Sequence, residues 1–336
     1  MPVADKYNRC IKDLRISVTD RCNFRCHYCM PEDIFGHKYQ FLNRDKILTF
    51  EEITHLARLF ASLGVTKLRL TGGEPLLRHE LYKLITKLNE IDGIEDIALT
   101  TNGYLLEKYG ARIKEAGLKR LTISLDTLNP DLFPKLAGKH LSLEHVIQGI
   151  EYAMTLGFSV IKLNSVIQKN INENEILDLL NFAISRGLII RFIEYMDVGN
   201  LNGWKMDEVV TAAEIISKIS SKHSIEAVEK NYWGEVANRY HFCDGSGEFG
   251  IIASVTQPFC GSCTRARISA DGKLFTCLFG SEGRDVKSLI RSGTTDEELL
   301  RILNSVWEKR SDRYSEERAH SGENSVKKIE MYQIGG

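Results

Sequence analysis

Residues 13–31 read DLRISVTDRCNFRCHYCMP, and this stretch decides how the rest of the chain is interpreted. Residues 14–18 alternate between apolar and polar side chains, which predicts a β-strand. Cys22, Cys26 and Cys29 follow directly on one loop. Three thiolates at such spacings can hold three irons of a 4Fe–4S cube. Because no fourth cysteine lies close in the sequence, the fourth iron would keep an open coordination position, as a catalytic metal site requires.

The first two-thirds of the chain repeats one unit, a short apolar run followed by a helical stretch that ends in glycine. We predict further strands at residues 67–71, 97–100, 121–125, 160–166 and 188–193. Helices are predicted after the capping box of Thr49 and Glu52, over about 79–91, up to Gly117, from Ser142 to Gly157 and from Asn172 to Gly187. Strands that alternate with helices indicate a parallel sheet covered by helices.

The polar residues within these strands favour part of a barrel over a doubly wound sheet. Leu14 and Ile16 share one face of the first strand, whereas Arg15 and Ser17 share the other, and the strands at 67–71, 121–125 and 160–166 are divided in the same way. A doubly wound sheet would need two apolar faces, whereas a barrel has one apolar face and one lumen. In the sixth strand Arg191 alternates with Ile193, and the pattern does not assign its faces.

The repeat of apolar run and helical stretch ends at about residue 215. We therefore predict an α/β fold with a barrel-like region at residues 1–215 and a smaller C-terminal region at residues 216–336. That second region contains a strand-like run at 250–255 and a final helix around 296–310.

The composition excludes several classes of protein. With 336 residues, 43% hydrophobic and 26% charged, the chain can form a sizeable core, and its net charge of -1 gives no overall basic field for nucleic acid. No apolar run reaches the roughly 20 residues of a membrane span, and the first 20 residues lack a signal-peptide core, so we expect a cytoplasmic protein. In that reducing compartment disulfides are not expected, and the six of the eight cysteines that fall into two tight sets are expected to bind metal.

A second cysteine set consists of Cys260, Cys263 and Cys277. By ligand chemistry alone it could be a zinc site completed by Cys243 or His241. Arg265 and Arg267 lie between these cysteines, and such a pair is either a phosphate-binding pair or a solvated surface pair. The first set likewise leaves open a zinc knuckle that uses His27, or an ordinary electron-transfer cluster.

The first cysteine set, with Tyr28 just before its third cysteine, resembles the radical S-adenosylmethionine superfamily. The sequence TGGEP at 71–75 extends this resemblance, since two glycines after a strand let the backbone approach a ligand closely. The resemblance implies a partial (β/α)6 TIM-type barrel. It also implies that S-adenosylmethionine chelates the open iron and yields a 5′-deoxyadenosyl radical, which abstracts a hydrogen atom from the substrate.

Within that superfamily, the chain resembles the GTP 3′,8-cyclase family of molybdenum cofactor (molybdopterin) biosynthesis. The resemblance rests on residues 13–31, on TGGEP, on the second cysteine set with TRAR at 264–267, and on the terminal Ile334, Gly335 and Gly336. It implies that a second 4Fe–4S cluster replaces the zinc alternative and binds the guanine end of GTP. The reaction implied is a radical lyase reaction that converts GTP to (8S)-3′,8-cyclo-7,8-dihydroguanosine 5′-triphosphate.

The resemblance also implies roles for individual residues. GTP would be bound by Arg15, Arg69, Thr100, Lys162, Arg265, Ala266 and Arg267, and S-adenosylmethionine by Tyr28, Gly73, Ser124 and Met196. The Gly335–Gly336 tail would assist catalysis next to Arg15, Arg265 and Arg267. Cys10 and Cys243 match no ligand position, and no Gly-x4-Gly-Lys-Ser/Thr loop is present, so GTP would be held by side chains and an iron.

The implied partners are an electron donor, a downstream cyclic pyranopterin monophosphate synthase and a second copy of the chain in a homodimer. Three alternatives remain at this point. They are a peptide-modifying radical enzyme with an auxiliary cluster, a non-catalytic iron–sulfur electron carrier and a zinc-stabilised binding protein.

Overall fold

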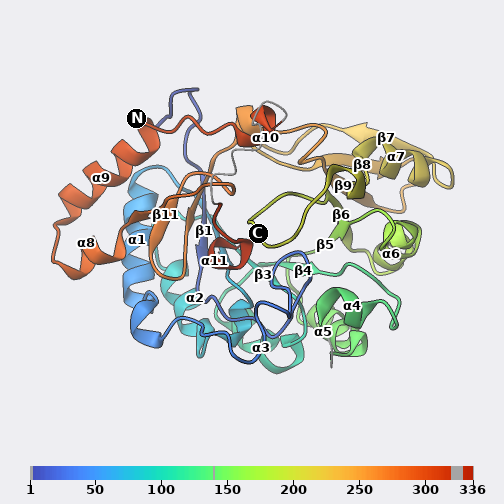
Figure 1. Cartoon of the computed structure of the whole chain (residues 1–336), viewed down its shortest axis with the longest axis horizontal. Helices are drawn as coiled ribbons and strands as arrows, with labels where there is room; N and C mark the ends of the chain where they lie inside the picture. The colour runs from blue at the N-terminus through green and yellow to red at the C-terminus, as the bar shows by residue number, and fades with distance from the viewer. Residues whose placement is uncertain (1–2, 139–140, 319–327, 336) are drawn as a thin grey trace.

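The computed structural model describes residues 3–138, 141–318 and 328–335. Within these residues one open sheet of twelve strands runs in the order β12-β11-β10-β1-β2-β3-β4-β5-β6-β9-β8-β7 (Figure 1). The strands are β1 (Asp13–Ser17), β2 (Lys67–Thr71), β3 (Asp96–Thr101), β4 (Arg120–Ser124), β5 (Val160–Ile167), β6 (Ile189–Glu194), β7 (Ile225–Val228), β8 (Asn238–Phe242), β9 (Glu248–Ile252), β10 (Arg265–Ile268), β11 (Lys273–Phe275) and β12 (Arg284–Asp285). The six predicted strands are confirmed as β1 to β6, and the sheet remains an unclosed barrel.

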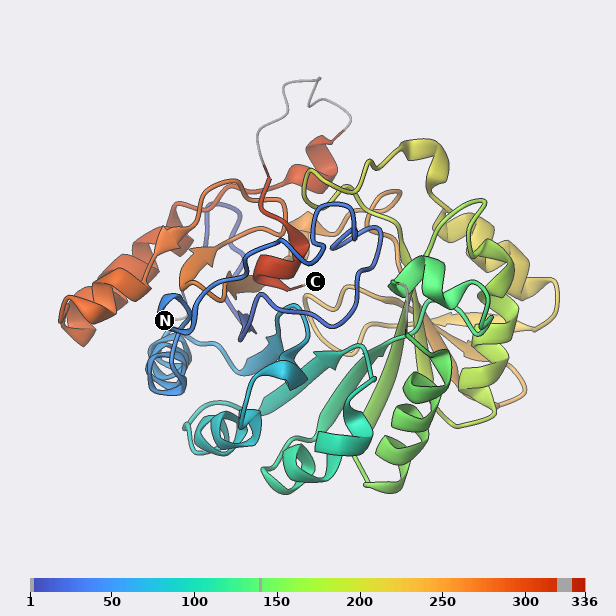
Figure 2. The same ribbon diagram turned by 60° about the horizontal axis from the view of Figure 1, so that its bottom comes forward.

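Helices follow the strands and cover the outer face of the sheet (Figure 2). The α-helices are α1 (Phe50–Ser62), α2 (Leu81–Asn89), α3 (Leu106–Glu115), α4 (Phe133–Ala137), α5 (Leu143–Thr155), α6 (Ile176–Ile184), α7 (Ala212–Ser220), α8 (Lys287–Arg291), α9 (Asp296–Glu308), α10 (Tyr314–Glu317) and α11 (Met331–Ile334). The short 3-10 helices are η1 (Arg44–Lys46), η2 (Pro75–Leu77), η3 (Glu173–Glu175), η4 (Met206–Glu208) and η5 (Cys260–Ser262). None of the described helices is both long enough and apolar enough to span a bilayer.

The helix starts show which local signals were read correctly. The capping box of Thr49 and Glu52 is present at α1, and the Ser142 side chain accepts from a backbone amide at the start of α5. The predicted cap at Asn172 is wrong. Its side chain accepts from the Gln168 amide and donates to the carbonyls of Asp126 and Val166, so it is used to fix the preceding loop, and η3 precedes α6 instead.

The two faces of the sheet differ as the alternating pattern predicts. Leu14 and Ile16 are at most 1% exposed and belong to the core between the sheet and the helices. On the opposite face, Arg15 is paired in register with Arg69 on β2 and with Arg267 on β10. The structure also assigns the two faces of the sixth strand, β6. Because Ile190 and Phe192 are fully buried in the core, Arg191 faces the lumen with the other arginines.

The C-terminal region extends both edges of the same sheet. β9 pairs in parallel with β6, and β10 pairs in parallel with β1, so eight neighbouring described strands are parallel. Antiparallel β8 and β7 complete one edge, and β11 and β12 complete the other. The division at residue 215 stays a prediction, but the pairing of β10 with β1 places the second cysteine set beside the first strand of the barrel-like region.

Helices α3 and α5 pack closely because Gly149 has no side chain. A Cβ atom at Gly149 would lie 2.3 Å from the carbonyl oxygen of Gly103. We expect Gly149→Ala to lower the free energy of unfolding by about 1–3 kcal/mol, the usual cost of overpacking. Chemical denaturation measures this. Gln148→Ala, on the exposed side of the same helix, is the control and should stay within about 0.5 kcal/mol of the parent. Equal stability of the Gly149 variant and the parent would contradict the close packing.

Candidate active site

Both cysteine sets line one cavity of about 290 Å³ on the inner side of the sheet. The first set lies on the loop after β1. In the second set, Cys260 and Cys263 precede β10, and Cys277 follows β11. Two cysteine sets that are far apart in the sequence therefore face the same space, which is the central feature of the site.

The loop of the first cysteine set is held in place by Arg25. Its Nη1 donates to the carbonyls of Cys22 (2.8 Å) and Phe24 (2.7 Å), and its Nε donates to Phe35 O (2.7 Å). Burial, with the charge of Glu74, raises the pKa of the Cys22 thiol to about 12. Burial and the neighbouring thiols also raise the pKa values of Cys26 and Cys29. Three half-buried thiols from one loop line the same cavity, and bound iron would favour their thiolate forms, so this set fits the cluster that the sequence predicts.

A zinc ion at the first set would lack His27, the fourth ligand that the zinc alternative requires. His27 Nε2 forms a hydrogen bond with Gln168 Oε1, and His27 does not line the cavity. Among the described residues, no three His, Cys, Asp or Glu side chains are arranged around a single metal-ion position. A cluster does not need ligands around one common position, because each iron binds its own cysteine.

The second cysteine set has a cationic environment. Arg265 Nη2 donates to Cys263 Sγ at 3.2 Å. Burial alone would raise the pKa of Cys263, but the charges of Arg265 and Arg310 outweigh it and lower this pKa to about 6. Burial and Asp312 raise the pKa of Cys277 to about 11. The fit to a cluster therefore rests here on three thiols at the cavity wall, one of which is already poised to ionise.

The two candidate fourth zinc ligands of the second set lie elsewhere. Cys243 is exposed and accepts a hydrogen bond from Ser224, and His241 lies beside Glu226 on the β7–β8 ribbon. Neither lines the cavity, and neither does Cys10. All eight cysteines are free thiols.

Arginines form much of the cavity wall. The described lining residues include Arg15, Arg69, Arg191, Arg265, Arg267 and Arg310. Burial and the charges of Arg267 and Arg69 lower the pKa of Arg15 well below its ordinary value. The Nε groups of Arg191, Arg265 and Arg267 are buried and have no hydrogen-bond partner among the described residues. Because an unpaired buried donor is costly, this wall is suited to an anionic ligand.

The structure brings most of the predicted ligand-binding residues to this cavity. Tyr28, Gly73, Ser124, Met196 and Thr100 all line it. Two residues are placed differently. Lys162 is on the same face of the sheet, next to Thr122 in register, but is not a lining residue. The Ala266 side chain is fully buried in the outer core, so only its backbone can face a ligand.

Two close contacts shape the wall around the residues predicted to bind S-adenosylmethionine. A Cβ atom at Gly73 would lie 2.3 Å from Arg21 O, so only glycine fits there. The Tyr28 hydroxyl donates to Asp126 Oδ2 at 2.8 Å, and Asp126 Oδ1 accepts from the Val166 amide at 2.8 Å. Asp126 therefore fixes the orientation of Tyr28, a role that the sequence analysis missed.

Sequence analysis also missed Arg191 and Glu74. Arg191 had a signal, because it occupies an alternate position in a predicted strand. Glu74 is part of the TGGEP sequence, and its buried carboxylate accepts from the amides of Leu76 and Asn102 and from the Thr101 hydroxyl. Burial raises the pKa of Glu74 to about 7 despite these three donors. Through these hydrogen bonds Glu74 links the end of β2 to the end of β3 beside the cavity.

The C-terminal helix α11 covers the loop of the first cysteine set. The Tyr332 hydroxyl lies 2.8 Å from the Tyr39 hydroxyl, and Tyr332 packs with Met30 and Phe35. Gly335 lies against Thr71, which lines the cavity, while Gly336 is outside the described residues. Figure 2 shows α11 on the inner side of the sheet, next to the blue N-terminal loops.

The fold, the cysteine loop and a family model together define the class of protein. A model described as the Radical SAM superfamily matches residues 16–183, and one described as Molybdenum Cofactor Synthesis C matches residues 188–316. The crystal structure of Streptococcus suis SuiB bound to S-adenosylmethionine shares the fold, with a TM-score of 0.63 at 17% identity over 94% of this chain and 69% of that chain. This chain is thus a radical S-adenosylmethionine protein by class.

The more similar relatives narrow this class. A GTP 3′,8-cyclase from Acidothermus cellulolyticus is 52% identical over 328 residues, which are 96% of this chain and 91% of that protein. One from Staphylococcus haemolyticus is 50% identical over 337 residues, or 99% of each chain. The chain belongs to the GTP 3′,8-cyclase family. Membership implies S-adenosylmethionine and two 4Fe–4S clusters as cofactors.

The contact between Gly335 and Thr71 can be tested. A Cβ atom at Gly335 would lie 2.0 Å from Thr71 Cγ2, and the Gly335 φ of 68° already favours glycine. We expect Gly335→Ala to displace α11, so that the amide of residue 335, which donates to Met331 O, exchanges its hydrogen at least about tenfold faster. Gly293→Ala is the control, because Gly293 has a φ of 80° but no atom within 4 Å. Unchanged exchange in the Gly335 variant would show that the contact does not hold the tail.

Proposed function

We propose that this chain converts GTP to (8S)-3′,8-cyclo-7,8-dihydroguanosine 5′-triphosphate, the first reaction of molybdenum cofactor biosynthesis. The observation that carries the proposal is a single cavity lined by two cysteine sets and by an arginine wall with unpaired buried donors. S-adenosylmethionine at the first cluster supplies, after one-electron reduction, the radical that removes the ribose 3′ hydrogen of GTP. The remaining tasks belong to residues of this chain.

The first group of residues holds the cofactors. Cys22, Cys26 and Cys29 would bind the first cluster. Around S-adenosylmethionine we place Tyr28, Gly73, Ser124 and Met196, all on the cavity wall. The Asp126 carboxylate accepts a 2.8 Å hydrogen bond from the Tyr28 hydroxyl and so fixes the orientation of that side chain. The missing side chain at Gly73 lets the backbone come close to the bound molecule.

The second group of residues holds GTP. Arg15, Arg69, Arg265 and Arg267 would bind the triphosphate, since planar guanidinium groups bind phosphate oxygens in a bidentate manner. Arg191 joins this group because its Nε is buried and unpaired among the described residues. The Thr100 hydroxyl accepts from Arg69 Nη1 at 3.0 Å and thereby orients that guanidinium group. Ala266 would contribute its backbone only.

The other end of GTP would lie at the second cluster, held by Cys260, Cys263 and Cys277. Gly335 would assist catalysis from the Thr71 side of the cavity, together with Arg15, Arg265 and Arg267, and Gly336 is proposed for the same catalytic role. The contact of Gly335 with Thr71 supports this placement of the tail. A water-poor, cationic cavity would also strengthen each charge interaction with the bound nucleotide.

The proposed partners follow from the chemistry. The chain would need an electron donor for its clusters, and its product would pass to a cyclic pyranopterin monophosphate synthase. We also propose a homodimer and a cytoplasmic location, where oxidation-sensitive clusters and free thiols are kept reduced.

Anaerobic turnover with dithionite, S-adenosylmethionine and GTP deuterated at ribose C3′ tests the function. Deuterium in 5′-deoxyadenosine is the expected result, because the proposal requires hydrogen transfer from that carbon. Unlabelled 5′-deoxyadenosine without loss of GTP would leave a radical enzyme with another substrate, such as a peptide. Absence of 5′-deoxyadenosine from protein with both clusters assembled would favour an electron carrier.

Lys162 gives a second test through pH. Burial and the charges of Arg191 and Arg120 lower the pKa of Lys162 to about 8. A bound triphosphate favours the charged amine and raises this pKa. Above pH 8 binding must therefore take up a proton, and the affinity for GTP should fall by up to about tenfold per pH unit, whereas below pH 8 this group causes no change.

Equilibrium binding of GTP between pH 7 and 8.5 measures the effect, because Arg191, whose pKa burial and Arg69 lower to about 9, would add its own titration at higher pH. Lys162→Arg should bind tightly with a flatter pH profile, and Lys162→Met should bind more weakly with an equally flat profile. If the parent and the Met variant lose affinity in parallel as the pH rises, Lys162 does not contact the triphosphate.

A further inference from the structure

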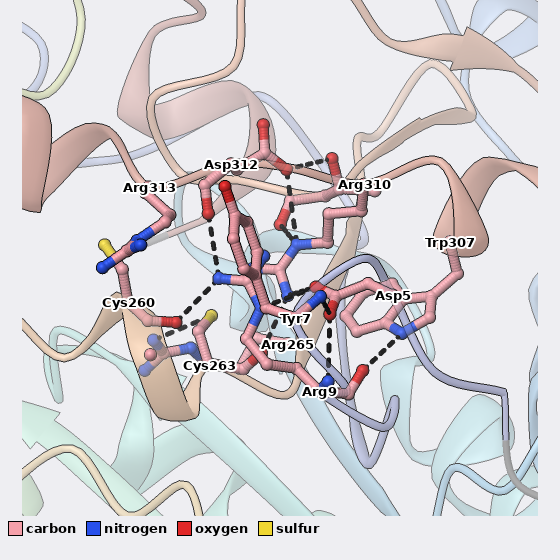
Figure 3. A network of polar contacts seen from close by, with 12 residues as sticks. Asp5, Tyr7, Arg9, Cys260, Cys263, Arg265, Trp307, Arg310, Asp312 and Arg313 are labelled. Carbon is pink, nitrogen blue, oxygen red and sulfur yellow. Dashed lines mark hydrogen bonds and ion pairs between the residues drawn. The ribbon is translucent and has the colours of Figure 1, made fainter.

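A buried polar network borders the second cysteine set, and its Arg310 and Asp312 also line the cavity. Figure 3 shows Asp5 between Arg9 and Arg310, with dashed contacts that reach Cys260 and Cys263. The network joins the N-terminal segment to the chain just after α9. The side chains of Asp5, Arg9 and Arg310 are all at most 1% exposed.

Arg9 holds the first cysteine of the set by its backbone. Its Nη1 donates to Cys260 O at 2.7 Å and to Asp312 O at 2.9 Å. Its Nε donates to Asp5 Oδ2 at 2.6 Å. One planar guanidinium group thus links three different segments, with the cysteine carbonyl among them.

Arg310 holds the other two cysteines in the same manner. Its Nη1 donates to Cys263 O at 2.8 Å and to Asp5 Oδ2 at 3.2 Å. Its Nε donates at 3.1 Å to the carbonyl of Thr276, the residue before Cys277. Together, the two arginines bond to the backbone at or next to every cysteine of the second set.

Asp5 fixes the two arginines relative to each other. Its Oδ2 accepts from both guanidinium groups, and its Oδ1 accepts from the amides of Tyr7 and Arg9, each at 2.9 Å. Buried ion networks contribute little net stability, because desolvation offsets their attraction. Their frequent effect is to fix one geometry, which is what a set of metal ligands needs.

We propose that Asp5, Arg9 and Arg310 are positioning residues that hold the backbone of Cys260, Cys263 and Cys277 in the geometry that accepts the second cluster. The inference rests on the proposed function in one respect, the assignment of a cluster to this set. The carbonyl contacts require the forked donors of arginine, which lysine lacks. Charge alone therefore does not replace them.

The test isolates each cysteine set in the full-length chain. In one background Cys22, Cys26 and Cys29 are changed to Ala, and in the other Cys260, Cys263 and Cys277 are changed to Ala. Arg9→Lys and Arg310→Lys are placed in both. After anaerobic reconstitution with iron and sulfide and removal of unbound metal, iron per chain is measured, and the dithionite-reduced proteins are examined by electron paramagnetic resonance.

In each lysine variant, we expect the second set to retain at most about a third of the iron found with both arginines present. The remaining cluster should give a shifted resonance spectrum. The first set in the other background should keep its iron and its spectrum, which also shows that the variants fold. Trp307→Phe is the matched control. It removes the 2.9 Å bond from Trp307 Nε1 to Arg9 O without touching a cysteine carbonyl, and it should keep full iron in both sets.

Three results would overturn the proposal. One is full iron and an unchanged spectrum for the second set in both lysine variants. Another is an equal loss of iron from the two sets, or an equal loss in Trp307→Phe, since either would indicate general destabilisation. The last is a second set that binds no iron even with both arginines present, which would remove the cluster assignment as well. None of these readouts depends on GTP, so failure of the turnover experiment is separable from failure here.

Discussion

The parallel pairing of β10 with β1 is the constraint on which the site depends. It places Arg265 beside Asp13 and Arg267 beside Arg15 in register. Because the strands are parallel, Cys263, two residues before β10, and Cys22, five residues beyond β1, lie at opposite ends of the pair, and both line the cavity along its inner face. Residues 188–316 and residues 16–183 match separate family models, yet the active site exists only where their strands meet.

The two cysteine sets are held in the same way in different electrostatic surroundings. An arginine bonds to cysteine carbonyls in each case, Arg25 in the first set and Arg9 with Arg310 in the second. At the first set burial, with the charge of Glu74, outweighs the charge of Arg25 and raises the pKa of Cys22. Near the second, arginines lower the pKa of Cys263. Positive surroundings favour added electrons at a cluster, so the protein provides two different settings for the same kind of cofactor.

The sequence predicts much of this arrangement, and its failures have physical causes. Strands β1 to β6 were found because each is a short apolar run followed by a helical stretch, and β1, β2, β4 and β5 also carry a period-two pattern. Strand β10 was not predicted. Its four residues are buried in the structure, but arginine at alternate positions gives the same sequence pattern whether it faces solvent or a barrel lumen. Asn172 was misread because a side chain that can cap a helix can equally bond to a loop. The links from Arg9 and Arg310 to the cysteine carbonyls join residues that are distant in the sequence, and such contacts leave no local signal.

The arginine wall shows why this cavity is built for a ligand rather than for stability. Arg15, Arg69 and Arg267 lie side by side in register, and burial, together with the charges of nearby arginines, lowers the pKa values of all three. The Nε groups of Arg267 and of the neighbouring Arg191 and Arg265 lack partners among the described residues. In the absence of an anion this arrangement works against folding, because each guanidinium group loses water and gains like charges. The apolar outer face of the same strands, buried against the helices, must therefore supply the stability that lets the inner face remain cationic.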